Sequence, residues 1–493
     1  MSIWTPAATW WECSSGEPAR VAIESKSIDY VAHHERHGRV IDQVPFWFLG
    51  NFHFFTIAIG FVGPSLGLGW GYTALAGALG ILFGTVFVAF HASQGVELGL
   101  PQMIQSRAQF GFRGVVLVLI GTLATFMGFN VADTVLTAHG LHGIFGWNEH
   151  VVALAAAVAS ALLAIWGHDW LHRIFRWCFA LSLPLYTLLT LAIIGGFVHP
   201  TAWTPGAFGW APFAAQFAAS ASYNITYAPS VSDYSRYLPH DTPPRRIIAA
   251  VFIGASSSAI WLIALGAWLA NRLGASDGLV ALYVAGNSLL PGFGAALALA
   301  SVLALVATMG FNAYSGMLTI ITGLSSLFEW PPTGRMRILA VLLLTAAALA
   351  LSLAIRVGAI SLVFTVLTIM LYLLVPWTAV NLADYFYVRR GRYAITHLFT
   401  PRGIYGAWSR RGLGAYAVGF AAMVPFFVLP DIYTGPAARA LDGVDISWLV
   451  GLPVAAAVYL WLARSYDASH EAHAIRASDR ELNITRAAPP PAC

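Results

Sequence analysis

Long apolar runs, separated by short polar stretches, fill the chain from about residue 45 to residue 463. Each run approaches the roughly 20 residues that a helix needs to cross a bilayer. The pattern therefore predicts about twelve membrane-spanning helices. They lie near residues 45–68, 71–92, 114–140, 150–167, 174–197, 207–230, 246–271, 293–325, 337–354, 358–382, 412–430 and 445–463.

Polar segments flank the apolar region. Residues 1–44 are polar and mixed in charge. They lack the basic start, apolar core and small-residue cleavage site of a signal peptide, so we expect this segment to stay in the cytoplasm. Residues 465–493 are polar and contain Pro-Pro-Pro near their end. This composition predicts a disordered cytoplasmic tail.

The basic residues indicate how the spans are oriented. If both ends and every even-numbered loop share one side, that side holds all but three of the 26 Lys and Arg residues. The three on the other side are Arg272, Arg356 and Arg439. Cytoplasmic loops carry an excess of Lys and Arg. We therefore expect an even number of spans with both termini in the cytoplasm.

Two spans carry residues that interrupt helices. The sixth contains Pro229 within Tyr-Ala-Pro-Ser, and the first contains Gly60, Gly63, Pro64, Gly67 and Gly69. Broken helices at matching positions of two halves are typical of transporters built from inverted repeats. The first and sixth spans match if the repeat is five helices long. The glycines are also consistent with close helix packing alone.

Composition agrees with a chain whose solvent is mostly lipid. Hydrophobic residues make up 58% and charged residues 10% of the 493 positions, whereas soluble domains carry about 25% charged residues. Mean hydropathy is +0.70. A soluble enzyme and a disordered chain are excluded. The net charge of +4 reflects loop orientation, so no nucleic-acid partner is expected.

Other chemistry is sparse. Cys13, Cys178 and Cys493 lie far apart, which indicates neither a disulfide framework nor a metal knuckle. The sequence carries no recognisable nucleophile–base set and no metal motif. We therefore expect neither enzymatic activity nor a bound cofactor.

Four segments near span ends carry recognisable motifs. They are Ile28-Asp29-Tyr30 through Glu35-Arg36 with Phe46-Trp47-Phe48 and Asn51; Ser106-Arg107 with Phe110-Gly111; Ser232-Asp233-Tyr234-Ser235-Arg236-Tyr237; and Pro376-Trp377, Asn381, Ala383-Asp384-Tyr385-Phe386, Arg389 and Arg390. In this order and placement the set resembles the purine–cytosine permease group of the nucleobase:cation symporter-1 family. The resemblance extends from about residue 23 to residue 465.

The resemblance implies an all-α, leucine-transporter-like fold, with two inverted repeats of five helices plus two C-terminal helices. The repeats would occupy residues 45–200 and 201–384, followed by a cytoplasmic loop with the last two helices at 385–464. It also implies alternating access around a midplane site. The transported compound would be a flat nitrogen heterocycle, such as cytosine or a purine, carried with H⁺ or Na⁺.

Asp133 is the only acidic residue near the centre of a predicted span, where carboxyls are costly and usually mark a pathway. The family usually places Gly-Trp here, with an amide four residues after the Trp. Gly128-Phe129 matches that pair with Phe replacing Trp, and Asp133 takes the amide position; Asn130 takes it under a shifted alignment. Phe129 and Asp133 share a helix face, so we expect Phe129 to stack on the substrate and Asp133 to bind its edge.

The change from amide to carboxyl leaves alternatives open. An ionised carboxylate only accepts hydrogen bonds, which favours a cationic heterocycle or vitamin precursor. A protonated Asp133 would instead carry the coupling proton. A packed carboxyl without a transport role is the third interpretation.

The sixth span offers Ser222, Tyr223 and Asn224 ahead of Pro229. The family places an aromatic residue here, on the face of the substrate opposite the one in the third span. Tyr223 is our candidate and Tyr227 the second choice, with Ser222 as a further substrate contact. An ordinary packing tyrosine is the alternative.

The eighth span offers Thr308 and Asn312, four residues apart. Sodium-coupled relatives place two hydroxyls here, and hard cations need several oxygen ligands, so the single Thr308 favours H⁺ over Na⁺. Asn312 is expected to bind the substrate, or else to bond a neighbouring helix. His53, in the first span, is a candidate proton relay or a packing histidine.

Asp233 and Arg236 follow the sixth span and are expected either to anchor the helix end or to form an inner gate. The small loops argue against a membrane-embedded enzyme, and the lack of an appended soluble domain argues against a sensor. Midplane breaks beside one acidic residue favour a closed site over a channel. We therefore expect a secondary active transporter in the plasma (inner) membrane, with a small heterocycle and the lipid bilayer as its partners.

Overall fold

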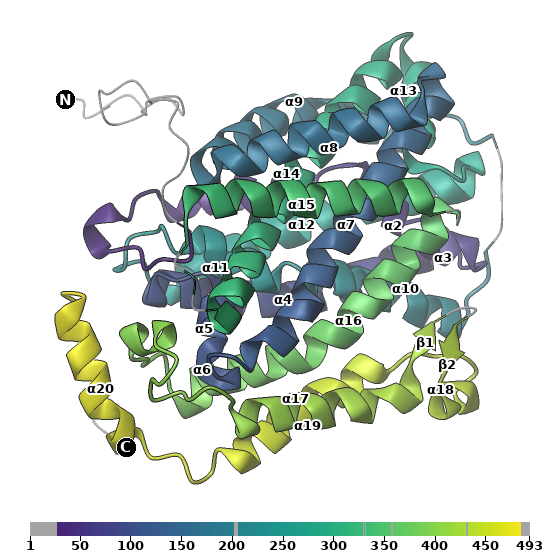
Figure 1. The fold of residues 1–493 in the computed structure, drawn as a ribbon. Coiled ribbons are helices and arrows are strands. Elements are labelled where there is room, and N and C mark those ends of the chain that lie inside the picture. Colours follow the sequence, from purple (N-terminus) through teal and green to yellow (C-terminus); the bar gives the residue numbers. More distant parts are fainter. Residues whose placement is uncertain are drawn as a thin grey trace, which may run out of the picture.

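The computed structural model describes residues 27–201, 206–328, 330, 332–355, 358–429 and 432–484. These residues form a bundle of helices that run mostly along one direction (Figure 1). The expected cytoplasmic segment before residue 27 and the Pro-Pro-Pro stretch lie outside the described residues.

Every predicted span coincides with a helix or a set of successive short helices. In order, these are α1 (Gln43–Gly50) with α2 (Phe54–Ile59) and α3 (Val62–Ser65), α4 (Trp70–Leu98), α7 (Val115–Phe145), α8 (Glu149–Trp166), α9 (His168–Ile194), α10 (Trp210–Ile225) with α11 (Ala228–Ser235), α12 (Pro244–Leu273), α14 (Phe293–Phe328), α15 (Gly334–Ala354), α16 (Ala359–Ala383), α17 (Arg410–Met423) and α19 (Ser447–Leu462). The predicted all-α membrane architecture is confirmed. Among the described residues, eight helices are long and apolar enough to cross a membrane, or nine with one bent pair, so the number twelve stays a prediction.

Shorter elements connect the spans. They are η1 (His33–Glu35), η2 (Val40–Asp42), α5 (Gln102–Gln105), α6 (Arg107–Phe110), α13 (Gly278–Leu289), the π-helical turn η3 (Asp384–Val388), η4 (Ile395–Phe399), η5 (Val424–Phe426), β1 (Val428–Leu429), β2 (Tyr433–Thr434), α18 (Pro436–Ala440) and α20 (Ala468–Glu481). Strands β1 and β2 form an antiparallel pair. Helix α13 was not predicted, because its 12 residues are too short to cross a bilayer.

The prediction of a disordered tail from residue 465 is wrong for the described part. Helix α20 forms there, and the Asp467 side chain caps it by accepting a hydrogen bond from the Ser469 backbone at 2.8 Å. Glu471 accepts a hydrogen bond from the Arg389 guanidinium at 3.0 Å. This tertiary contact orders a segment that its polar composition alone does not.

Both spans are interrupted, and the first is interrupted at two places. A bend of 56° separates Val40–Gly50 from Phe54–Ser65 at residues 51–53, which the sequence did not predict, and a turn at Gly60 and Phe61 separates α2 from α3, within the predicted Gly60–Gly69 run. Gly60 also packs closely: a Cβ atom there would lie 2.4 Å from the Ile263 carbonyl oxygen of α12. The sixth span breaks as predicted, with Pro229 in the first turn of α11.

Helix α4 packs closely against α10 and α12. A Cβ atom on Gly84 would lie 2.2 Å from the Ala221 carbonyl oxygen of α10, and one on Gly80 would lie 2.4 Å from that of Phe217. Membrane helices associate through such small residues because lipid supplies no hydrophobic drive between them. The glycines thus bring the sixth span against the centre of the bundle.

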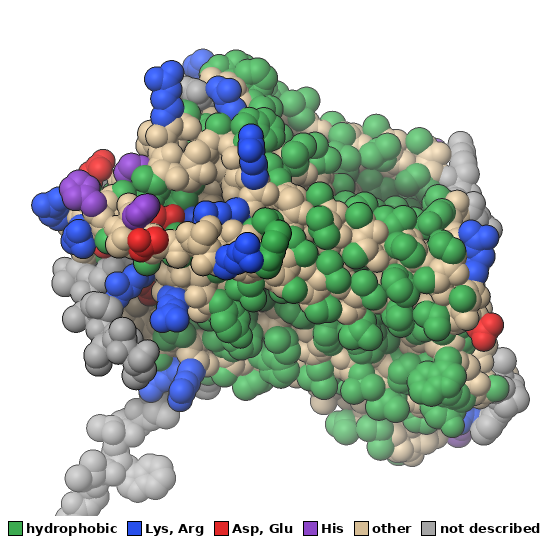
Figure 2. Space-filling model, turned by 90° about the horizontal axis from the view of Figure 1, so that it is seen from below, with side chains coloured by type: hydrophobic (Ala, Val, Ile, Leu, Met, Phe, Trp, Pro, Cys, Tyr) green, Lys and Arg blue, Asp and Glu red, His purple; other side chains and the backbone are tan. Residues whose placement is uncertain are grey.

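The two ends of the bundle differ in charge. Lys and Arg side chains gather mainly at one end, whereas apolar side chains cover most of the remaining visible face (Figure 2). The described chain starts and finishes at the same end of the bundle (Figure 1). We call this the basic end.

We predict that Gly84→Ala destabilises the protein by about 1–3 kcal/mol, because the added methyl group forces α4 away from α10. Gly71→Ala is the matched control, since no atom lies within 4 Å of a Cβ at Gly71 in the same helix. Thermal unfolding in detergent measures both. Equal unfolding temperatures for the two variants would show that the α4–α10 contact is not tight.

Candidate functional site

The two helix breaks meet in the middle of the bundle. The Asn51 amide donates hydrogen bonds to Asn224 Oδ1 at 2.9 Å and to the Ala255 carbonyl of α12 at 2.7 Å. The Tyr227 hydroxyl donates to the Gly50 carbonyl at the end of α1. Broken helices leave backbone groups without partners, and lipid supplies none. Each break therefore supplies donors for the other.

Side chains also close the first break locally. His53 is buried, and its Nε2 lies 3.0 Å from the Gly50 carbonyl oxygen. The Thr56 hydroxyl donates to the Asn51 carbonyl at 2.6 Å and lies 2.8 Å from the Tyr223 hydroxyl. The structure thus places His53 at the bend, in a position that holds the bent backbone.

Three aromatic rings gather beside the breaks. Phe129 and Tyr223 lie edge-to-face, with ring centroids 6.1 Å apart. Phe55 lies 5.6 Å from each of them and is nearly parallel to Tyr223. A planar ring held between two parallel rings needs them about 7 Å apart, so Phe129 and Tyr223 do not form a sandwich in this structure. We call Phe55, Phe129 and Tyr223 the aromatic cluster.

Sequence reasoning missed Phe55. The available signal was its position in the aromatic run around His53, directly after the break. Of this run, only His53 was singled out as a candidate. The fold brings Phe55 to the two rings that the sequence did single out.

Asp133 and Asn130 lie within one turn of Phe129 on α7, and each is only 1% exposed. No described residue donates a hydrogen bond to either carboxylate oxygen of Asp133 or bonds the Asn130 side-chain amide. The Asp133 carboxyl lies within electrostatic range of the Tyr223 and Tyr227 hydroxyls. Buried polar groups are almost always hydrogen-bonded. This part of α7 therefore offers unused hydrogen-bonding capacity beside the aromatic cluster.

The other predicted site residues, Thr308, Ser222 and Asn312, differ in the hydrogen bonds that their side chains already form. The Thr308 hydroxyl donates to the Ala304 carbonyl of its own helix at 3.2 Å. The Ser222 hydroxyl donates to the Leu367 carbonyl and so links α10 to α16. Asn312 is buried on α14. Ser222 therefore uses its only hydrogen-bond donor to bind a neighbouring helix, so that donor is not available to a substrate.

Stacked aromatic side chains continue from the centre toward the basic end. Phe311 contacts Trp47 and Tyr227, with centroids 6.0 and 5.7 Å away. Tyr234 stacks on Phe311 at 4.6 Å with only 5° between the ring planes. A run of ring contacts thus leads from Tyr223 of the aromatic cluster through Tyr227 and Phe311 to Tyr234.

Asp233 lies in the last turn of α11, and Arg236 directly follows that helix. The fully buried Arg236 guanidinium donates to the Ser27 carbonyl at 2.8 Å and to the Tyr314 hydroxyl of α14 at 3.4 Å. Asp233 accepts a hydrogen bond from the Gln102 backbone at 3.1 Å. Arg236 thus ties the segment before α1 to α11 and α14.

Residues 30–451 match the profile of a family described as permeases for cytosine/purines, uracil, thiamine and allantoin. The chain belongs to this family. Members are transporters, so the predicted absence of an enzymatic role agrees with the family.

Individual permeases are similar over most of their length. The chain is 32% identical over 445 residues to YxlA of Bacillus subtilis, whose name assigns it provisionally to the purine-cytosine permeases; the match covers 90% of this chain and 96% of YxlA. It is 25% identical over 475 residues to the purine-cytosine permease fcyB of Emericella nidulans, covering 90% and 89%.

The fold is that of a solved member of the same class. The closed conformation of Mhp1, a nucleobase-cation-symport-1 family transporter with bromovinylhydantoin bound, superposes with a TM-score of 0.70 at 17% identity. The match covers 94% of this chain and 98% of Mhp1. The predicted leucine-transporter-like fold is thereby confirmed, and this permease is a secondary active symporter by family.

We predict that Asn51→Asp destabilises the permease by about 3 kcal/mol or more. The new carboxylate would face the Asn224 and Ala255 oxygens with no donor to offer, and an unpaired buried charge is costly. Asn148→Asp is the matched control, because Asn148 Oδ1 only accepts backbone hydrogen bonds at the start of α8, which a carboxylate does equally well. Thermal unfolding in detergent, followed by circular dichroism, compares the two. Equal losses would contradict the proposed link between the breaks.

Proposed function

We propose that this permease imports a planar nitrogen heterocycle of the nucleobase class, with the substrate bound between the aromatic cluster and the polar groups of α7. The observation that carries the proposal is the buried Asp133–Asn130 pair, whose side chains have no hydrogen-bond partner among the described residues, beside Phe55, Phe129 and Tyr223. Aromatic faces bind flat rings without regard to edge pattern. The polar groups then select the edge.

The chemistry of the edge supports a nucleobase. An amide both donates and accepts, whereas a carboxyl accepts and, when protonated, also donates. Asn130, Asn312 and Asp133 together match the mixed donors and acceptors of cytosine or a purine. The descriptions of the family and its relatives, which name cytosine and purines, agree with this class. Ser222 contributes only if the bond to Leu367 opens.

H⁺ is the coupling ion that we propose. The carbonyls of Gly50 and Asn51 at the first break already accept hydrogen bonds from Tyr227 and Thr56, and the Thr308 hydroxyl is bonded within its own helix. These oxygens are therefore less available for a Na⁺ cage. A buried carboxylate without a partner is unfavourable as an anion, and binding a proton removes that cost. His53 would serve by holding the break rather than by relaying the proton.

A cationic heterocycle or vitamin precursor is the second candidate. The same unpartnered Asp133 carboxylate favours it, because a cationic substrate would neutralise the charge directly. Thiamine, named in the family description, is a heterocycle of this kind. The two candidates differ in what Asp133 does: it carries a proton in the first and pairs with the substrate in the second.

We further propose that the basic end faces the cytoplasm of the plasma (inner) membrane, in accord with the positive-inside rule. Asp233 and Arg236 would then form part of an inner gate. Opening toward the cytoplasm would require Arg236 to release the Ser27 carbonyl and the Tyr314 hydroxyl, and Tyr234 to leave Phe311.

We predict that Asp133→Asn lowers proton-driven accumulation of labelled cytosine in proteoliposomes at least tenfold, while exchange of labelled for unlabelled cytosine persists. An amide binds the substrate edge but cannot carry the coupling proton. Thr134→Val is the matched control, because the Thr134 hydroxyl only bonds the Asn130 carbonyl of its own helix. Parallel runs with a sodium gradient test the ion.

The same assay separates the alternatives. Wild-type accumulation driven by sodium alone would contradict proton coupling. Undiminished proton-driven accumulation by Asp133→Asn would remove Asp133 from coupling. If the wild type takes up a cationic heterocycle and ignores cytosine, and Asp133→Asn abolishes that uptake, the second candidate replaces the first.

We predict that Phe55→Leu raises the KM for the substrate roughly tenfold or more, since a stacked aromatic contributes about 1–3 kcal/mol per base. Phe52→Leu is the control: it lies three residues away in the same span, but its ring packs against Tyr186 and Trp261. Initial uptake rates over a range of substrate concentrations provide the comparison. A larger change in KM for Phe52→Leu would place the substrate elsewhere.

A further inference from the structure

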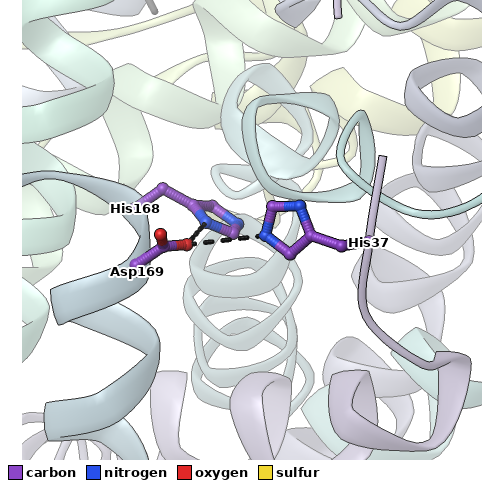
Figure 3. A group of neighbouring side chains, drawn as sticks. All are labelled: His37, His168 and Asp169. Carbon is purple, nitrogen blue, oxygen red and sulfur yellow. Dashed lines mark hydrogen bonds and ion pairs between the residues drawn. The ribbon is translucent and has the colours of Figure 1, made fainter. Parts of the chain in front are cut away.

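Three potential metal ligands converge at the basic end. His168 and Asp169 begin α9, and His37 lies in the segment before α1 (Figure 3). Asp169 Oδ1 lies 3.0 Å from His168 Nδ1 and 3.7 Å from His37 Nε2. One ligand atom from each residue falls within 4.8 Å of the others. None of the three is among the proposed substrate contacts or the stacked rings of Trp47, Tyr227, Phe311 and Tyr234.

The spacing suits a small transition-metal ion. Zn²⁺ binds histidine nitrogen at about 2.0–2.1 Å and carboxylate oxygen at about 2.0–2.2 Å, usually with tetrahedral geometry. Tetrahedral ligands at these distances are roughly 3.3–3.6 Å apart. The separations from Asp169 Oδ1 to the two histidines, 3.0 and 3.7 Å, lie on either side of that range, and the two histidine nitrogens lie within 4.8 Å of each other. Small side-chain rotations are enough to place an ion between them.

The surroundings of His37 fix the ring for ligation. Its Nδ1 lies 3.0 Å from the Glu35 carbonyl oxygen. If Nδ1 donates its proton there, the lone pair of Nε2 faces Asp169. Metal-binding histidines almost always use their second nitrogen in this way, which sets the tautomer and orients the ring. The His37 backbone also donates to the Tyr237 carbonyl at 2.6 Å, so the segment itself is anchored.

The site is held on one side and open on the other. The His168 ring is largely buried against Tyr237, with centroids 4.2 Å apart. The side chains of His37 and Asp169 are 58% and 81% exposed. An ion can therefore reach the three ligands from solvent, and water can complete its coordination as at three-ligand zinc sites.

We propose that His37, His168 and Asp169 form a binding site for a divalent transition-metal ion of the Zn²⁺ type, which clamps the segment before α1 onto α9. That same segment supplies the Ser27 carbonyl to the Arg236 guanidinium. A bound ion would hold the segment against the gate and slow opening toward the basic end. The effect on transport rests on the proposed function, whereas binding of the ion does not.

Zinc binding to the full-length permease in detergent, purified without a polyhistidine tag, tests the site. We expect isothermal titration with ZnCl₂ to give one saturable site and a rise in unfolding temperature. His37→Gln and Asp169→Asn should each weaken binding at least tenfold and abolish the thermal shift. His34→Gln, an exposed histidine in the same segment, should leave both unchanged.

Other outcomes overturn the proposal. No saturable binding to the wild type removes the site. Unchanged binding by His37→Gln and Asp169→Asn places the ion elsewhere, for example at the stacked His33–His240 pair. If Zn²⁺ binds as expected but does not inhibit uptake when it is present on the side of the vesicle membrane that the basic end faces, the clamp is ruled out. A failure of cytosine uptake bears on the proposed substrate and leaves the binding result unaffected.

Discussion

Backbone N–H and C=O groups within a bilayer have no water to bind, and each one left without a partner costs several kcal/mol. A helix that breaks at this depth therefore needs donors and acceptors from its neighbours. Here the two broken spans bond one another through Asn51, Asn224 and Tyr227, and Thr56 closes the first break within its own span. The glycines of α4 bring α10 close enough for these bonds to form. The positions of Phe55 and Tyr223, on the two broken spans, depend on this arrangement.

Asp133 and Asn130 are buried polar side chains with no hydrogen-bond partner among the described residues. At the first break, Asn51 and His53 each leave one polar side-chain atom without a partner in the described part of the chain, whereas Asp133 and Asn130 each leave both. Burying a carboxyl within a membrane costs free energy, and such residues are rare and usually serve transport. Asp133 and Asn130 lie within one turn of Phe129 on α7, near the aromatic cluster, and they are the groups to which we assign substrate or proton binding.

The basic end combines several contacts that hold one conformation. Stacked rings at Phe311 and Tyr234 continue the ring contacts of Tyr223 and Tyr227 toward this end, and Arg236 ties the segment before α1 to α11 and α14. The His37–His168–Asp169 group joins that segment to α9 as well. Charged and aromatic contacts of this kind can exchange partners, which is the basis of the inner gate that we propose.

The sequence by itself determined the spans, the charge asymmetry, the family motifs and the break at Pro229, because apolar length, arginine placement and proline act locally. It singled out Phe129, Asp133 and Tyr223, but it did not place the sharp bend of the first span. That bend, at residues 51–53, depends on acceptors from α10 and α12 and on the Tyr227 hydroxyl. Phe55, the ordered helix α20 and the meeting of His37 with α9 depend on contacts between distant segments. Only the tertiary structure decides those, because a side chain's partners are fixed by packing and not by its neighbours in the chain.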